Sequence, residues 1–246
     1  MAVNNIYSDI AARTGGDIYI GVVGPVRTGK STFIKKFMEN MVLPNIEDSQ
    51  RRERATDELP QSSAGRTIMT TEPKFIPEDA VEITLPSKSR MKVRMIDCVG
   101  YIVPSALGYI EGENPRMVKT PWFEEEIPFN MAAEIGTQKV ISEHSTIGLV
   151  VTTDGSISEI PRNEYAETEK RVINELQELH KPFIVLLNCK EPNSVASQKL
   201  AAEMTNEYGV PVVVTLNHFV ADTDAEVAYV KERCEAMGAT FAVARV

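Results

Sequence analysis

The segment GPVRTGKS at residues 24–31 constrains this 246-residue chain more than any other feature. It matches the pattern G-x-x-x-x-G-K-[ST] and lies between a β-branched run at residues 17–23 and an apolar helical pattern at residues 30–41. Glycines let such a loop curl until its backbone N–H groups converge on phosphate oxygens, and the following helix directs its positive end at the same anion. The segment therefore predicts a nucleotide site on a strand–loop–helix unit.

Two side chains of this loop have predicted tasks. The ammonium group of Lys30 is expected to reach the β- and γ-phosphates, and the hydroxyl of Ser31 is expected to ligate Mg²⁺. The residues expected to contact the nucleotide are Gly24, Pro25, Val26, Arg27, Thr28, Gly29, Lys30, Ser31, Thr32, Gly100 and Asn188.

A second motif, D-x-x-G at residues 97–100, closes a strand predicted at residues 91–98. Asp97 is expected to hold Mg²⁺ through water, and Gly100 to let the next turn approach the γ-phosphate. The alternative is an ordinary turn at the end of a strand. Tyr101 follows, where Ras-like switch proteins carry a water-orienting Gln, so hydrolysis is expected to be slow or to use other groups.

The segment RTIMTTE at residues 66–72 is a candidate switch. The hydroxyl and carbonyl of Thr70 or Thr71 could complete the Mg²⁺ shell and report the γ-phosphate, although Ser and Thr also simply cap or line loops. The sequence does not choose between the two threonines. The residues expected to ligate the metal are Ser31, Thr70 and Asp97.

Arg27 stands at the fourth position of the loop and could supply positive charge to a transition state. Its alternative is a contact with solvent or with a switch carboxylate, and Arg66 offers the same choice. The residues expected to act in catalysis are Lys30, Thr70, Thr71, Asp97 and Arg27.

The base-binding motif of GTPases, N-K-x-D, is altered in this chain. The corresponding residues Asn188, Cys189 and Glu191 place a thiol where Lys would stack on guanine and lengthen the Asp by one methylene. Misplacing a bidentate acceptor weakens discrimination between bases. We therefore favour ATP over GTP, with Mg²⁺ as its partner ion.

Alternating strands and helices predict an α/β fold with a mostly parallel, three-layer sheet and one antiparallel hairpin. Strands are expected at 17–23, 81–85, 91–98, 146–153, 182–189 and 211–216, and helices at 30–41, 162–180, 194–208 and 222–237. Residues 44–71 and 101–130 fit no period and are expected as long loops. We expect residues 1–237 to form a P-loop domain and residues 238–246 to begin a following segment.

Composition excludes several classes of protein. With 26 basic and 35 acidic residues the net charge is −9, which argues against a general nucleic-acid binder. No apolar run is long enough to cross a bilayer, and no secretory signal opens the chain. The three cysteines and three histidines have no disulfide or zinc spacing, so we expect a cytoplasmic protein.

Four segments, GPVRTGKSTFIKKFM, DELPQSSAGRTIMTTEPKF, VRMIDCVGY and MAAEIGTQKVI, resemble the stage IV sporulation protein A family over essentially the whole chain. The resemblance implies a fold akin to translation-factor-type GTPases that has turned to ATP. It implies that ATP hydrolysis drives self-assembly of a spore-coat basement layer, in the mother-cell cytoplasm and peripherally on the outer forespore membrane.

The same resemblance implies partners. They are further copies of the chain, a small amphipathic membrane peptide and other spore coat proteins, with no nucleic acid. Chains of this family continue past residue 246, so polymer contacts are expected mainly in a C-terminal region absent from this sequence. Two alternatives stay open: a GTPase-type regulatory switch, and a scaffold that binds nucleotide without turnover.

Overall fold

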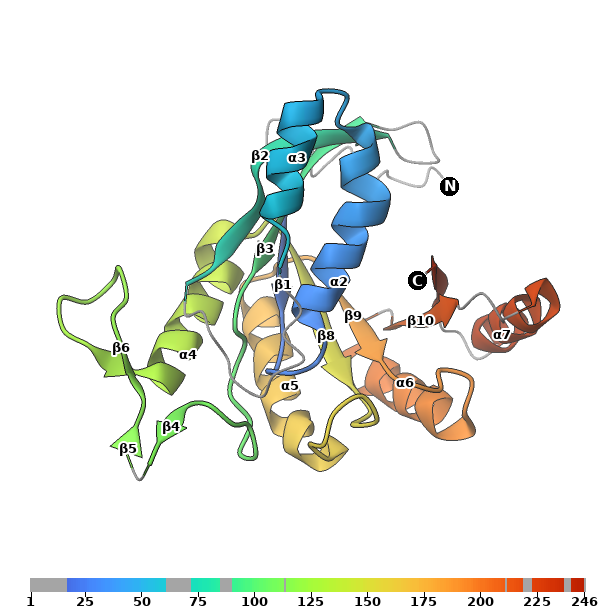
Figure 1. The fold of residues 1–246 in the computed structure, drawn as a ribbon. Coiled ribbons are helices and arrows are strands. Elements are labelled where there is room, and N and C mark those ends of the chain that lie inside the picture. Colours follow the sequence, from blue (N-terminus) through green and yellow to red (C-terminus); the bar gives the residue numbers. More distant parts are fainter. Residues whose placement is uncertain are drawn as a thin grey trace.

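The computed structural model describes residues 17–60, 72–84, 90–112, 114–210, 212–218, 223–236 and 240–245. Its centre is a seven-stranded sheet in the order β11-β10-β9-β8-β1-β3-β2, with helices on both faces (Figure 1). Every neighbouring pair is parallel except β2 and β3, which are antiparallel. The carboxyl ends of the parallel strands therefore share one edge of the sheet.

The strands of this sheet are β1 (Asp17–Val23), β2 (Lys74–Thr84), β3 (Arg90–Asp97), β8 (Ile147–Thr153), β9 (Phe183–Asn188), β10 (Val212–His218) and β11 (Thr240–Arg245). The α-helices are α2 (Lys30–Phe37), α3 (Ser49–Asp57), α4 (Phe129–Lys139), α5 (Arg162–Glu178), α6 (Val195–Tyr208) and α7 (Asp224–Ala236). Shorter helical turns are η1 (Met38–Val42), η2 (Leu43–Asn45) and η3 (Val140–His144).

Side chains alternate along the central strands, so the sheet carries one apolar core on each face. On β1, Val22 belongs to one core and Val23 to the other, and on β8 Leu149 and Val150 alternate in the same way. One core is covered by α2, η1 and α3, and the other by η3, α5 and α6. Successive residues of a strand point to opposite faces of the sheet. Helices cover both faces, so both sets of side chains are buried, and this is why the central strands are continuous apolar runs.

These features confirm the predicted α/β class, the mostly parallel sheet and the antiparallel pair. The helices predicted from residues 162, 194 and 222 are present as α5, α6 and α7. The helix expected at 30–41 is α-helical to Phe37 and continues as the π-helical turn η1. Among the described residues, no helix combines the length and the apolar character needed to cross a bilayer.

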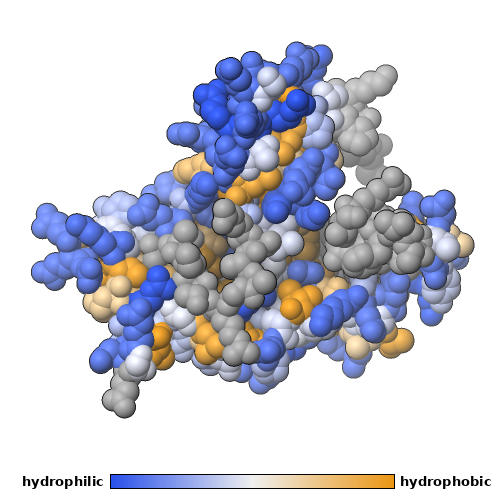
Figure 2. Space-filling model, viewed as in Figure 1, coloured by the Kyte–Doolittle hydropathy of each residue, from blue (hydrophilic) through white to orange (hydrophobic). Residues whose placement is uncertain are grey.

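Two expectations about loops need correction. The stretch 44–71 contains α3, which begins where the Asp48 side chain accepts a hydrogen bond from the backbone N–H of Arg51. Ala55 is its one buried residue, and Figure 2 shows a strongly hydrophilic surface over this projecting helix. A helix that buries so little has no apolar period for sequence analysis to detect.

The stretch 101–130 is mostly irregular, but it contains two small antiparallel pairs. They are β4 (Ile110–Glu111) with β5 (Asn114–Pro115), and β6 (Met117–Val118) with β7 (Ile127–Pro128). Both project from the sheet beside α4 (Figure 1). At the other end of the chain, β11 pairs with β10 and extends the main sheet, in the stretch that we expected to begin a following segment.

A buried carboxylate ties α5 to its neighbours. Glu169 is fully buried and accepts two hydrogen bonds from the guanidinium of Arg162, at 2.6 and 2.8 Å. Its oxygens also accept from the hydroxyls of Thr152 (2.5 Å) and Tyr208 (2.9 Å). The charge is therefore paired and fully hydrogen-bonded, as a buried carboxylate must be to remain ionised at low cost.

Replacing this carboxylate should destabilise the fold strongly. Glu169→Ala removes the carboxylate that pairs with Arg162 and accepts from two hydroxyls, and we expect the free energy of unfolding to fall by about 3–5 kcal/mol. The matched control is Glu203→Ala on α6, which breaks only the exposed ion pair with Lys199 and should cost less than about 1 kcal/mol. Urea unfolding followed by circular dichroism measures both, and equal losses would contradict this account.

Candidate phosphate-binding site

The loop between β1 and α2 is tightly curled. Gly24, Arg27 and Gly29 all have positive φ, at 129°, 60° and 93°. The hydroxyl of Thr28, which is fully buried, donates to the carbonyl of Pro25 at 3.0 Å and closes the loop on itself. Gly29 is the N-cap of α2, so the free backbone N–H groups at the start of that helix face the interior of the loop.

Lys30 lies buried at this helix start, with 5% of its surface exposed. Its ammonium group donates to the carbonyls of Pro25 at 2.6 Å and Gly24 at 3.4 Å. Burial lowers the pKa of Lys30, and the nearby Cys98 and Asp97 oppose that shift. Among the described residues Lys30 makes no salt bridge, so an anion held within the loop would stabilise its charged form.

Ser31 and Asp97 meet at the carboxyl edge of the sheet. The Ser31 hydroxyl donates to Oδ2 of Asp97 at 2.9 Å, while Oδ1 is buried and has no hydrogen-bond partner among the described residues. Burial raises the pKa of Asp97, and the bond from Ser31 and the charge of Lys30 oppose the rise. A hydroxyl beside a carboxylate with an unused oxygen fits a hydrated magnesium ion, because both are hard oxygen ligands.

Gly100 packs directly against the loop between β1 and α2 (residues 24–31), which we call the phosphate loop. Its φ is +88°, and a Cβ at this position would lie 2.1 Å from the carbonyl oxygen of Gly24 and 2.5 Å from the Lys30 ammonium nitrogen. Only a residue without a side chain permits this approach. The two motifs that the sequence separates by some seventy residues therefore form one site.

Asn188 braces the loop from the other side. Its side-chain amide donates to the carbonyl of Thr28 at 3.0 Å and lies against Gly29. Cys189 is buried, so its thiol points into the protein rather than toward a bound base, and burial raises its pKa to about 11. Lys190 and Glu191 are exposed.

With this geometry in place, residues 1–231 match the family described as stage IV sporulation protein A, ATPase domain. The chain belongs to this family. It is 58% identical over 220 residues to stage IV sporulation protein A of Bacillus anthracis, and 59% identical over 210 residues to that of Clostridioides difficile (strain 630). The Bacillus subtilis (strain 168) relative is 54% identical over 220 residues.

These matches cover most of this chain but only part of each relative. The aligned regions are 85–89% of this chain and 43–45% of the relatives. The chain thus spans less than half the length of the stage IV sporulation protein A sequences that it matches, and what it shares with them is the ATPase domain.

Not every predicted site residue can be placed. Thr70, Thr71 and Arg66 lie outside the described residues. Thr32 is exposed on α2. Arg27 is partly buried, and its guanidinium opposes the rise in the pKa of Tyr165 that burial causes. The other predicted contacts, Gly24, Pro25, Val26, Thr28, Gly29, Lys30, Ser31, Asp97, Gly100 and Asn188, come together at one edge of the sheet.

The loops that follow β8 and β9 are linked to each other, which the sequence did not predict. Asp154 accepts from the backbone N–H and the hydroxyl of Ser156, at 2.9 and 2.6 Å. The Ser156 hydroxyl oxygen in turn accepts from the backbone N–H of Lys190 at 2.9 Å. The turn signal D-G-S directly after the strand marks this position, but only the tertiary fold shows which loop it holds.

The close approach of Gly100 can be tested with one added methyl group. We expect Gly100→Ala to reduce the affinity for Mg-ATP by at least about tenfold, because the methyl must displace Gly24 or Lys30. Gly209→Ala is the matched control, since Gly209 has φ +64° and nothing within 4 Å of an added Cβ.

Both substitutions carry the strain of a positive φ, about 1–2 kcal/mol. Calorimetric titration should therefore separate them in affinity, whereas thermal unfolding should show a loss of stability in both. Unchanged nucleotide affinity in Gly100→Ala would contradict a site at this contact.

Proposed function

We propose that this chain binds Mg-ATP at the loop of residues 24–32 and hydrolyses it. The observation that carries the proposal is the buried Lys30 ammonium, which lies beside the Ser31–Asp97 pair and the close-packed Gly100 in a chain of an ATPase-domain family. Lys30 and the loop amides would bind the phosphates. Gly24, Pro25, Val26, Arg27, Thr28, Gly29 and Thr32 complete the proposed contacts.

Ser31 and Asp97, together with Thr70, would hold magnesium. The metal would supply neutralising charge to the phosphate oxygens when bound. Thr70 and Thr71 are the proposed sensors of the γ-phosphate. The position after Gly100, where Ras-like proteins carry a water-orienting Gln, holds the buried Tyr101, and this supports slow turnover.

The proposed nucleotide is ATP rather than GTP. Asn188 keeps a hydrogen bond to the loop, which supports a part in holding the site together. The buried thiol of Cys189 leaves no side chain to stack on a base in the manner of the GTPase Lys. Glu191 would place its carboxylate one methylene too far for a bidentate contact with guanine.

At the level of the cell, we propose the role that the family resemblance implies. ATP hydrolysis would drive self-assembly of the basement layer of the spore coat, in the mother-cell cytoplasm and on the surface of the outer forespore membrane. Proposed partners are further copies of the chain, a small amphipathic membrane peptide and other coat proteins. Assembly would depend mainly on the part of the family's length that this sequence does not contain.

Two finer points of architecture belong to the same proposal. The central parallel strands with an antiparallel β2–β3 pair support kinship with translation-factor-type GTPases. Residues 1–237 are the proposed extent of the ATPase domain. The strand β11 then extends its sheet at the start of the final stretch.

The decisive experiment compares nucleotides and turnover in one variant pair. We expect the wild-type chain to bind ATP more tightly than GTP and to release phosphate, and Lys30→Ala to lose turnover by at least about a hundredfold. Lys35→Ala, a partly exposed position on the same helix where the side chain pairs with Glu39, is the control and should retain activity. Tighter binding of GTP would favour a GTPase-type switch, and equal phosphate release by wild type and Lys30→Ala would favour a scaffold without turnover.

The role proposed for Arg27 has its own test. If its guanidinium stabilises the charge of the transition state, Arg27→Ala should lower kcat by about a thousandfold and change the affinity for Mg-ATP by less than about twofold. Single-turnover kinetics and calorimetric titration provide the two numbers. A change in affinity with kcat preserved would assign Arg27 to ground-state binding instead.

A further inference from the structure

Tyr101, the residue after Gly100, points away from the phosphate loop. It is 2% exposed and belongs to the apolar core between the sheet and η3, α5 and α6. Its hydroxyl donates to Oε2 of Glu175 on α5 at 2.5 Å. Burial, together with this hydrogen bond, raises the pKa of Tyr101, so the hydroxyl keeps the proton that it donates.

The main chain of Tyr101 is attached to the phosphate loop. Its carbonyl accepts a hydrogen bond from the backbone N–H of Val26 at 2.9 Å, and Pro25 and Tyr101 form an isolated parallel bridge. Gly100 is therefore followed by a residue with two anchors. The backbone anchor lies on the phosphate loop, and the side-chain anchor lies on α5.

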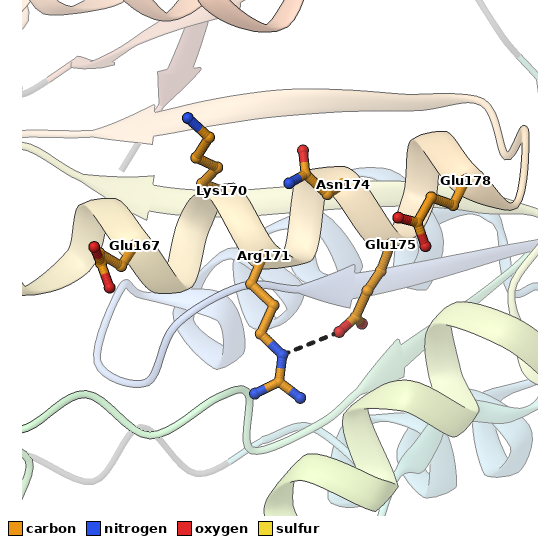
Figure 3. Close-up of a pocket in the computed structure, with 6 residues that line it drawn as sticks. All are labelled: Glu167, Lys170, Arg171, Asn174, Glu175 and Glu178. Carbon is orange, nitrogen blue, oxygen red and sulfur yellow. Dashed lines mark hydrogen bonds and ion pairs between the residues drawn. The ribbon is translucent and has the colours of Figure 1, made fainter.

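The side-chain anchor continues to the protein surface. The guanidinium of Arg171 lies 4.4 Å from the centroid of the Tyr101 ring and pairs with Glu175 at 3.2 Å. Arg171 also pairs with Glu134 on α4. Figure 3 shows Arg171 and Glu175 side by side on α5, where they line a shallow pocket.

A cation over the ring and a carboxylate at the hydroxyl fix a tyrosine more tightly than packing alone. Any displacement of the Gly100 peptide would have to break the hydroxyl bond or the Val26 bond. The peptide after a D-x-x-G glycine is the part of such a site that meets the γ-phosphate, which ADP lacks.

Resting on the nucleotide site proposed above, we infer that Tyr101 is a positioning residue for the reaction. Its hydroxyl bond to Glu175 holds the Gly100 peptide against the phosphate loop and so favours nucleoside triphosphate over diphosphate. Tyr101 stands at the sequence position of a water-orienting side chain, but it would act only through the position of the backbone, because its hydroxyl is bonded to Glu175.

The test is a selectivity measurement on the 246-residue chain. Calorimetric titration with the magnesium complexes of ADP and of the β,γ-imido analogue of ATP gives the ratio of the two affinities. We expect Tyr101→Phe to weaken binding of the analogue by about tenfold and to change ADP binding by less than about twofold. Loss of both affinities to the same degree, or of neither, overturns the inference.

Tyr208→Phe is the matched control. Tyr208 also belongs to this core and donates its hydroxyl to a glutamate, Glu169, at 2.9 Å, but it makes no contact with the phosphate loop among the described hydrogen bonds. It should lose comparable stability and keep the affinity ratio. A similar change of the ratio in both variants would mean that general destabilisation is the cause, and would also overturn the inference.

A second route removes the acceptor at a half-buried surface position. Glu175→Ala should reproduce the loss of selectivity, whereas Glu178→Ala, which lines the same pocket, should not. The double variant Tyr101→Phe/Glu175→Ala should lose no more selectivity than either single variant, because each substitution removes the same Tyr101–Glu175 hydrogen bond. Additive losses contradict a shared bond. A wild-type chain that binds neither nucleotide overturns the proposed function, and this inference with it.

Discussion

Parallel pairing of β1 with β3 is the interaction on which the site depends. The register sets Val22 of β1 opposite Asp97 of β3, so the chain leaves both strands at the same edge of the sheet. From β1 it enters the phosphate loop, and from β3 it enters the D-x-x-G turn. The pairing therefore delivers the Lys30 ammonium, the Ser31 hydroxyl and the Asp97 carboxylate to one place without any local sequence signal that joins them.

Hydrogen bonding distinguishes Glu169, which is fully buried, from Asp97, which buries one carboxylate oxygen. Every oxygen of Glu169 has donors, from a bidentate arginine and two hydroxyls, and the group locks α5 onto the sheet. Oδ1 of Asp97 has none among the described residues, although it is buried. A buried oxygen without a hydrogen-bond partner costs free energy. Proteins retain such oxygens at sites where a bound ligand supplies the missing partner.

Asn188, the last residue of β9, and Cys189, which follows it, have different surroundings. Asn188 still holds the phosphate loop through the Thr28 carbonyl, which is useful to any nucleotide. Cys189 has instead become a core residue, with its thiol buried. The Asn188 bond to the loop involves no base, and the buried Cys189 thiol fits the proposed preference for ATP.

The sequence by itself determined the local elements and the phosphate loop. A glycine-rich turn between a β-branched run and an apolar helix is specified by neighbouring residues, as are the buried strands β8 and β9 and the helices α5 and α6. The sequence did not predict helix α3, because that helix buries only Ala55. It also did not predict the first residues of β2, because apolar and charged side chains do not alternate regularly there. Only the tertiary structure decided that Oδ1 of Asp97 has no hydrogen-bond partner within the described ranges, that Asn188 donates to the loop after β1, and that the Tyr101 hydroxyl reaches Glu175. These facts depend on contacts between residues far apart along the chain, and the direction of a side chain at such a contact is set by the packing of both partners.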